Sequence, residues 1–369
     1  MNPVPKSREE IERELLAFIQ TTEWAERHGF TDLALRSFEH QSATIASYGA
    51  YARHRDATAI PSWEEIPPVP ASAFRSHELS AAPPGEELVT FETSGTTVSR
   101  PGRVRLRSTL LYRASLLRNF AHHLLPGGER MRAVVFGPTR EEAPRSSLWF
   151  MADRVVRELG TGGMWIVDRG QPRWERADQE FERAVKEREP LLLLGTSLLF
   201  LAYFERCDRE GIRHKLPPGS RAMDTGGSKG SGVEVPREEI HKAFGRVLEL
   251  PPSHVVNEYG MAEMGSQFYE DKLLAVHERR QAREGFVVPP WVRTRALDPE
   301  TMRECAPGTQ GILVHYDLAN LEIPMAIQTE DVGMVRGRYL ELQGRLPEAE
   351  RRGCSLPFEK FIELERRRA

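Results

Sequence analysis

Two loops rich in glycine and hydroxyl groups contain residues suited to holding a nucleotide. The first loop is Phe91-Glu92-Thr93-Ser94-Gly95-Thr96-Thr97, and the second is Asp224-Thr225-Gly226-Gly227-Ser228-Lys229-Gly230. Hydroxyls and backbone N–H groups can surround phosphates, and a glycine lets the backbone approach a ligand closely. No Gly-Lys-Ser/Thr follows the first loop, so it is not a Walker loop. Taken alone, such a loop is more typical of an ordinary surface turn.

Acidic residues follow in two later motifs. Asn257-Glu258-Tyr259-Gly260-Met261-Ala262-Glu263 comes after an apolar run, and Thr329-Glu330-Asp331-Val332-Gly333 precedes a Gly344-Arg345 pair. A carboxylate suits Mg²⁺ or ribose hydroxyls, and an arginine suits phosphate. Each acid or arginine considered singly is equally compatible with a solvated surface charge.

The order of the four motifs is more specific than any one of them. The Thr-Ser-Gly-Thr-Thr loop, the Gly-Gly loop, the Tyr-Gly-x-x-Glu segment and the Asp-x-Gly turn occur in that order over residues 88–350. In this order the chain resembles the adenylate-forming (ANL) superfamily, whose members activate carboxylic acids with ATP. The resemblance implies an α/β adenylation domain that uses ATP and Mg²⁺.

The resemblance also implies a role for each matching residue. The first loop would hold the β- and γ-phosphates, the second would lie against adenine, and Glu263 would bind Mg²⁺. Tyr259, followed by Gly260, would stack on the adenine ring, while Asp331 would accept hydrogen bonds from the ribose and Arg345 would contact ribose or phosphate. The implied nucleotide-binding residues of the two loops are Thr93, Ser94, Gly95, Thr96, Thr97, Gly226 and Gly227.

Two positions depart from the superfamily pattern. Val98 stands where a glycine is usual, with the usual lysine missing after it, and Ala262 replaces a threonine before the metal-binding glutamate. Arg100 or Arg103 could take the place of that lysine. We hypothesise that Lys229 supplies a positive charge at the phosphates.

The end of the chain points to one branch of the superfamily. Only residues 346–369 follow the Gly-Arg pair, so we expect the C-terminal mobile domain to be largely absent. This shortened form resembles the acyl-protein synthetase (LuxE-like) family, in which a near-C-terminal cysteine takes the acyl group from AMP and passes it to a partner reductase. Cys354 is the matching residue. Neighbouring arginines and a helix expected to begin at Pro357 would stabilise its thiolate, although a small buried cysteine is the alternative.

Alternating elements must position these motifs. Apolar runs at 132–136, 164–167, 191–194 and 255–256, separated by helix-length segments, predict an α/β fold with largely parallel strands. Ser7 and Glu10 have capping-box spacing before a helical pattern, and a Pro-rich connector lies at 66–70. We predict four parts, namely an N-terminal helical region (1–87), an α/β adenylation core (88–284), a small β-rich subdomain (285–345) and a short C-terminal segment containing Cys354 (346–369).

Composition and the pattern of apolar residues limit which partners and which cellular location are expected. The 369 residues carry a net charge of −3, which gives no electrostatic reason to expect nucleic acid as a partner. No apolar run is long enough to span a membrane, and we expect a cytoplasmic protein. We expect the widely spaced Cys207 and Cys305 to be small buried residues without chemistry. The His122-His123 pair is expected on a helix and His315 in a strand, again without chemistry.

The expected function is ATP-dependent activation of a carboxylic acid, expected to be a fatty acid, followed by transfer to Cys354 and a partner protein. One alternative is a ligase that passes acyl groups to CoA or to a carrier protein. A second is a nucleotide-binding subunit that has lost catalysis, as Val98 and Ala262 would suggest. Residues 136–140, 149–150 and 195–200 are either walls of the acid pocket or ordinary core.

Overall fold

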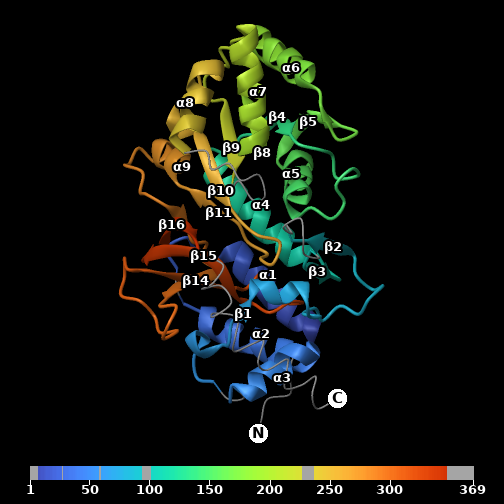
Figure 1. The fold of residues 1–369 in the computed structure, drawn as a ribbon, viewed down its shortest axis with the longest axis vertical. Helices are drawn as coiled ribbons and strands as arrows, with labels where there is room; N and C mark the ends of the chain where they lie inside the picture. The colour runs from blue at the N-terminus through green and yellow to red at the C-terminus, as the bar shows by residue number, and fades with distance from the viewer. Residues whose placement is uncertain (1–6, 27, 58–59, 94–100, 227–236, 347–369) are drawn as a thin grey trace. The chain divides into compact units, whose positions relative to one another are not determined.

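The structure is a computed structural model that describes residues 7–26, 28–57, 60–93, 101–226 and 237–346 (Figure 1). The chain forms two compact units whose segments alternate along the sequence. Unit 1 comprises Met1–Leu116, Met261–Ser266 and Val287–Ala369, and unit 2 comprises Leu117–Gly260 and Gln267–Phe286. The four-part division drawn from the sequence stays a prediction.

Unit 2 contains a parallel sheet with one antiparallel strand at its end. The strands are ordered β5-β4-β8-β9-β10-β11, and all neighbours except β10 and β11 are parallel. The predicted α/β fold with largely parallel strands is therefore confirmed. The strands are β4 (Met131–Phe136), β5 (Gly160–Trp165), β8 (Leu191–Thr196), β9 (Arg221–Thr225), β10 (Val255–Tyr259) and β11 (Phe268–Glu270).

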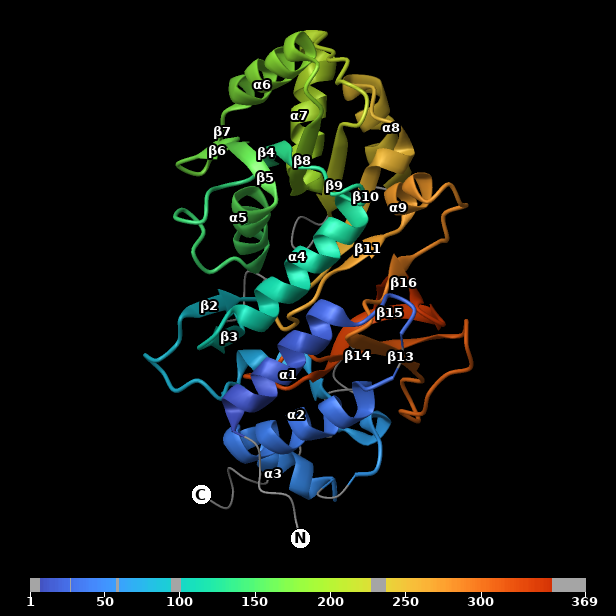
Figure 2. The same ribbon diagram turned by 180° about the vertical axis from the view of Figure 1, so that it is seen from behind.

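Helices cover both faces of this sheet (Figures 1 and 2). On one face α6 (Trp174–Glu187), α7 (Ser197–Glu210) and α8 (Arg237–Leu248) bury an aromatic core against the strands. On the other lie α5 (Ser147–Glu158) and the part of α4 (Leu110–Leu124) that belongs to unit 2. Burying both faces explains why strands such as β4 and β8 are largely apolar runs. The smaller elements of this region are β6 (Val167–Asp168), β7 (Gln171–Pro172), η3 (Pro252–His254), α9 (Lys272–His277) and β12 (Phe286–Val287).

Unit 1 contains an antiparallel sheet in the order β13-β14-β15-β16. The expected β-rich end of the chain is thus present. Part of the Pro-rich connector, β1 (Val69–Pro70), is an extended strand that pairs in parallel with β15. A separate hairpin joins β2 to β3. The strands are β2 (Val89–Glu92), β3 (Arg103–Leu106), β13 (Val292–Leu297), β14 (Gln310–Asp317), β15 (Ala326–Arg336) and β16 (Tyr339–Arg345).

The N-terminal part of unit 1 is helical, as predicted (Figure 2). It contains α1 (Arg8–Thr21), α2 (Phe30–Thr44) and α3 (Ala46–His54), followed by the short helices η1 (Trp63–Glu65) and η2 (Ala71–Arg75). The capping box is confirmed, since the Glu10 N–H donates to Ser7 Oγ (3.3 Å) and the Ser7 N–H donates to Glu10 Oε2 (2.9 Å). One face of α1 is buried through Ile11, Leu15 and Ile19.

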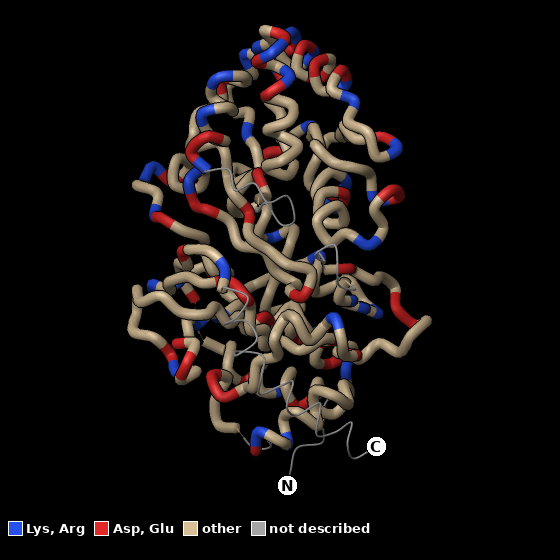
Figure 3. The backbone as a smooth tube through the Cα atoms, in the orientation of Figure 1, with Lys and Arg blue, Asp and Glu red and all other residues tan. Residues whose placement is uncertain are grey.

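Charges of both signs are interspersed along the described chain, in keeping with the near-neutral composition (Figure 3). Among the described residues, no helix combines the length and the apolar character that crossing a membrane requires. Cys207 is fully buried, as expected, and burial raises the pKa of its thiol. The expectation of a buried Cys305 was wrong, because this side chain at the edge of β14 is only half-buried.

The buried amide of Gln41 on α2 ties the helices of unit 1 to the segment between β14 and β15. Its Nε2 donates to the carbonyls of Asn320 and Ile323, both at 2.8 Å, and its Oε1 accepts from the Met325 N–H at 3.0 Å. All four backbone and side-chain groups are buried, so each bond replaces one that water would otherwise supply.

We therefore expect Gln41→Ala to lower the free energy of unfolding by about 2–4 kcal/mol, because it removes several buried hydrogen bonds and leaves a cavity. Urea denaturation would measure the change. Gln20→Ala is the matched control, since Gln20 is exposed on α1 and its loss should change stability by no more than about 0.5 kcal/mol. Equal stabilities of the two variants would contradict the assignment.

Candidate active site

The carboxyl edge of the parallel sheet in unit 2 brings together two of the predicted motifs. Gly226 comes directly after β9, and Gly260 comes directly after β10. These strands are parallel neighbours with Thr225 paired to Glu258, so the Gly-Gly loop begins beside the Tyr-Gly segment. Ligands of open α/β sheets bind outside the carboxyl ends of the strands, which makes this edge the candidate site in unit 2.

Both glycines at this edge are held against side chains that leave no room for a Cβ atom. A Cβ on Gly226 would lie 2.1 Å from the Ser197 hydroxyl, and one on Gly260 would lie 2.4 Å from Oε1 of Glu258. Any larger residue would have to displace these polar neighbours. The glycines therefore keep the backbone open at the edge where a ligand would approach.

A buried carboxylate, Asp224, organises the same edge. Its Oδ1 accepts from the Ser197 hydroxyl at 2.8 Å, and its Oδ2 accepts from Asn257 Nδ2 at 3.2 Å. The Asn257 amide also donates to the Asp224 carbonyl at 2.9 Å, while the Asn257 N–H donates to Glu270 at 3.1 Å. The ends of β8, β9 and β10 are thus tied to one another. Burial raises the pKa of Asp224 to about 6, although the bonds from Ser197 and Asn257 oppose this shift.

Tyr259, the predicted adenine-stacking residue, ends β10 with a buried ring. Its ring centroid lies 5.5 Å from that of Phe268 and 5.9 Å from that of Phe286. These contacts hold the ring at the carboxyl end of β10, directly before Gly260. The role of stacking on adenine stays a prediction.

Unit 1 brings together Asp331 and Arg345, the acid and the arginine of the last two motifs. They are directly opposed on β15 and β16, and Arg345 Nε donates to Asp331 Oδ1 at 3.1 Å. Asp331 is buried whereas the arginine side chain is 44% exposed, so the guanidinium keeps donors available toward solvent. The Asp331 N–H donates to the Thr329 hydroxyl at 3.0 Å, which fixes the backbone at the acid.

Thr93, the first residue of the phosphate-loop motif, closes the β2–β3 hairpin. Its N–H donates to the Gly102 carbonyl and its hydroxyl accepts from the Gly102 N–H, both at 2.9 Å. A Cβ on Gly102 would lie 3.0 Å from the backbone carbonyl carbon of Phe74, so glycine favours this close approach. Thr93 therefore anchors the base of the loop that the motif predicts to hold phosphates.

Glu263, the predicted Mg²⁺ ligand, lies in a turn of unit 1 in which the Met264 N–H donates to the Met261 carbonyl at 3.2 Å. The residue is buried, and its carbonyl accepts from Asn320 Nδ2 at 2.9 Å. No group of three or more potential ligands for a metal ion occurs in the part of the chain that the structure describes. Mg²⁺ bound with a nucleotide needs only one or two protein carboxylates, because phosphates and water complete its shell. The single carboxylate of Glu263 fits that requirement.

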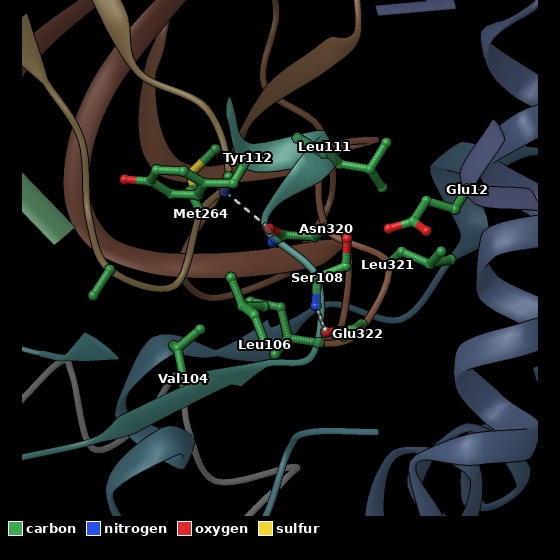
Figure 4. A pocket seen from close by; sticks show the side chains of 14 residues that line it. Glu12, Val104, Leu106, Ser108, Leu111, Tyr112, Met264, Asn320, Leu321 and Glu322 are labelled. Carbon is green, nitrogen blue, oxygen red and sulfur yellow. Dashed lines mark hydrogen bonds between the residues drawn. The ribbon is translucent and has the colours of Figure 1, made fainter. Parts of the chain in front are cut away.

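A small pocket in unit 1 lies beside this turn (Figure 4). Leu106, Leu111, Tyr112 and Met264 give it an apolar lining, and Asn320 and Glu322 add polar groups. It has room for about one water molecule, which is too little for an acyl chain. The pocket is therefore not itself an acid-binding cavity in this conformation.

The residues considered as walls of an acid pocket pack closely on one another in unit 2. A Cβ on Gly137 would lie 2.1 Å from the Trp149 ring, and one on Gly195 would lie 2.6 Å from Cβ of Phe136. The ring of Phe136 in turn lies 4.7 Å from that of Phe200. These contacts are those of ordinary core. The two expected histidine placements are confirmed, with His122 and His123 on α4 and His315 on β14.

A model of one protein family decides the identity of the chain. The model described as acyl-protein synthetase, LuxE, matches residues 28–362. The chain belongs to this family. It is thus a ligase of the acyl-protein synthetase type, and activation of a carboxylic acid through an acyl-adenylate is the chemistry that the family and the fold support.

Two curated proteins are similar to this chain over most of its length. The long-chain-fatty-acid–luciferin-component ligase of Aliivibrio fischeri is 22% identical over 319 residues, which cover 81% of this chain and 79% of that protein. The protein of the same name from Vibrio harveyi is 24% identical over 313 residues, covering 79% and 77%. The similarity extends over most of the length of all three chains.

Solved structures show the fold. An open conformation of 2-hydroxyisobutyryl-CoA ligase, in complex with 2-HIB-AMP and CoA, has a TM-score of 0.62 at 14% identity over 94% of this chain and 75% of that chain. The same ligase in its thioesterification state has a TM-score of 0.61 at 16% identity, covering 94% and 73%. At such low identity the likeness establishes the fold alone, and that fold is the ANL-type adenylation domain.

Seven of the predicted site residues fall outside the described residues of this family member, as does Val98. They are Ser94, Gly95, Thr96, Thr97, Gly227, Lys229 and Cys354. The sequence predicts no specific role for Asp224, Asn257 or Asn320, and it includes Ser197 only within 195–200, as pocket wall or core. Hydrogen bonds of these four side chains nevertheless position the motif segments. Asp224 and Asn257 stand within quoted motifs and could have been suspected from that position. Ser197 and Asn320 carry no comparable signal.

The raised pKa of Asp224 predicts how stability depends on pH. From its ordinary value of 3.8 up to about 6, the folded protein holds this proton and the unfolded chain does not, so stability falls as pH rises through that window. Asp224→Asn removes the titration. We expect the variant to lose about 2 kcal/mol less than the parent between pH 4 and pH 6, because this range contains about two thirds of the full titration set by the shift from 3.8 to about 6.

Urea denaturation across this pH range would measure both slopes. Asp298→Asn is the control, because hydrogen bonds from Thr301 lower the pKa of Asp298 and move its titration below the window. That variant should keep the parental slope. An unchanged slope in Asp224→Asn would mean that Asp224 does not bind its proton in the folded state.

Proposed function

We propose that this protein uses MgATP to convert a fatty acid to its acyl-adenylate, transfers the acyl group to Cys354, and then passes it to an acceptor protein. The family supports acyl transfer to protein, and the names of the two curated relatives support a long-chain fatty acid as the substrate class. The acceptor would be a protein whose nucleophile reacts with a thioester.

The observation that carries the proposal is the pairing of two glycine motifs at the carboxyl edge of the parallel sheet. Gly226 and Gly260 follow neighbouring parallel strands, and both are positions where a Cβ would collide with a polar side chain. An exposed backbone at such an edge suits a planar base and its ribose. Tyr259, which lies directly before Gly260, offers the aromatic ring for that base.

Charged residues of unit 1 supply the groups that an adenylate requires. In the proposed first step the substrate carboxylate attacks the α-phosphorus and pyrophosphate leaves. Asp331 would orient the ribose hydroxyls, and Arg345, held by that acid, would stabilise negative charge on phosphate. Mg²⁺, when bound at Glu263, would neutralise phosphate charge. In this proposal the protein promotes the reaction by positioning the reactants and by stabilising the charge on phosphate with preorganised groups.

The second step uses the sulfur of Cys354. Its thiolate attacks the acyl carbon of the mixed anhydride, so a C–S bond forms, the C–O bond to phosphate breaks, and AMP leaves with the electron pair. Arg351 and Arg352 stand close before this cysteine in the sequence and would favour the thiolate. The same thioester would then donate its acyl group to the acceptor protein.

The adenylation step is tested by pyrophosphate release with MgATP and a panel of fatty and aromatic acids. We expect Glu263→Gln and Asp331→Asn each to slow release about 100-fold or more, because each removes charge from the reacting groups. Glu300→Gln changes an exposed acid of the same type and serves as the control. Release at the parental rate in both site variants would count against the proposal.

Transfer to the cysteine is tested by intact-protein mass after incubation with MgATP and the same acids. The parent should gain the mass of one acyl group, and Cys354→Ala should not, while Cys207→Ala should behave as the parent. Pyrophosphate release without any mass gain would send the acyl group to CoA or a carrier protein instead. Neither signal across the panel would favour a nucleotide-binding subunit without catalysis.

A further inference from the structure

One side chain, Asn320, holds both sides of the turn that carries Glu263. Its Oδ1 accepts from the Gly265 N–H at 2.8 Å (Figure 4), and its Nδ2 donates to the Glu263 carbonyl at 2.9 Å. The two bonded groups flank Met264, so one amide fixes three consecutive residues. A carboxamide is suited to this, since it offers one acceptor and two donors in a plane.

The turn depends on this support because no strand or helix supplies it. Residues 261–266 lie between β10 and β11 with neither helical nor strand pairing. Asn320 is buried, so both bonds lie away from water and are not readily replaced by bonds to solvent. The backbone at Glu263 therefore has its position set from the segment after β14.

Asn320 is itself held on the opposite side. Its N–H donates to the Asp317 carbonyl at 3.1 Å, and its carbonyl accepts from Gln41 Nε2 at 2.8 Å. Close packing adds to these bonds, since a Cβ on Gly265 would lie 2.7 Å from Cβ of Ala319. The amide is thus presented from a rigid turn.

A second contact between the two turns fixes Ser266 without involving Glu263. The Ser266 hydroxyl donates to Asp317 Oδ1 at 2.8 Å, and the Trp291 indole donates to the Ser266 hydroxyl at 3.0 Å. Asp317 and Trp291 thus anchor the end of the segment, where it leads toward β11. By contrast, one of the two bonds from Asn320 acts on Glu263 itself.

We propose that Asn320 is the positioning residue for Glu263, setting the carboxylate in the orientation that binds Mg²⁺ with ATP. This inference rests on the proposed function, which gives Glu263 its metal. Residues that orient a metal ligand typically contribute about 10- to 100-fold to metal affinity. Asn320 acts on the ligand through the backbone at Glu263.

The test compares Asn320→Asp with the parent by calorimetric titration of ATP at a series of Mg²⁺ concentrations. Aspartate has the same size and can still accept from Gly265, but it cannot donate to the Glu263 carbonyl when ionised. We expect the Mg²⁺ concentration that gives half-maximal ATP binding to rise about 10-fold or more, with ATP binding without Mg²⁺ changed less than twofold. Asn320→Ala, which loses both bonds, should show at least the same rise.

Tyr48→Phe is the control for a general loss of stability. It removes one buried hydrogen bond, from the Tyr48 hydroxyl to the Pro67 carbonyl (3.0 Å), and it touches no residue of the turn. Its melting temperature should fall while its Mg²⁺ dependence stays parental. If Asn320→Asp does not fold, the inference is decided by Asn320→Ser, which keeps a smaller donor and should give an intermediate rise.

The outcomes separate this inference from the proposed function. A shifted Mg²⁺ dependence in Glu263→Gln together with a parental one in both Asn320→Asp and Asn320→Ala would overturn the positioning role alone. The same Mg²⁺ shift in Tyr48→Phe would also overturn it, since the effect would then be one of stability. A parent whose ATP binding ignores Mg²⁺ would overturn the metal role of Glu263 and the inference with it.

Discussion

Buried backbone groups beyond the ends of strands need hydrogen-bond partners that the sheet does not supply, and this constraint shapes several of the described segments that carry candidate site residues. An unpaired buried N–H or C=O group costs about 1–3 kcal/mol. At the carboxyl edge in unit 2 the partners are Asp224 and Asn257. In unit 1 Asn320 supports the turn at Glu263, and Thr93 closes its hairpin. Polar side chains near the chemistry are therefore part of the scaffold.

Close packing explains where these loops use glycine. A loop that turns sharply after a strand brings its backbone close to the side chains packed around it. Gly226 approaches Ser197 and Gly265 approaches Ala319 so closely that a Cβ would collide. Glycine at these positions is a packing requirement first, and it leaves the backbone open to a ligand as a consequence. A glycine in these motifs can therefore serve both close packing and ligand binding.

Local patterns predicted much of the fold, and long-range contacts account for what they missed. The capping box of Ser7 and Glu10 depends on neighbours three residues apart, and the buried strands depend on short apolar runs, so both could be read directly. Family resemblance correctly indicated the ANL-type fold, while the roles that it implies for the glycine and acidic motifs stay predictions. The bond from Asn320 to Glu263 joins residues far apart in sequence, and no local signal indicates it. No local signal indicates that Trp149 packs on Gly137 either. The sequence therefore cannot decide whether these residues are ordinary core or the wall of an acid pocket.

Two buried aspartates that hold neighbouring segments in place lower the stability of the folded protein near neutral pH. Burial raises the pKa of Asp224 and of Asp317 to about 6 in each case, even though each carboxylate accepts hydrogen bonds from nearby serines or backbone N–H groups. A raised pKa means that the charged form is less stable in the folded protein than in water. Near neutral pH both groups therefore reduce stability relative to solvated acids. Each nevertheless ties a residue that lies outside the strands to the end of one, Ser197 to β9 in one case and Ser266 to β14 in the other. The fold accepts less stability than an apolar core would give because a carboxylate can hold a loop in one defined position.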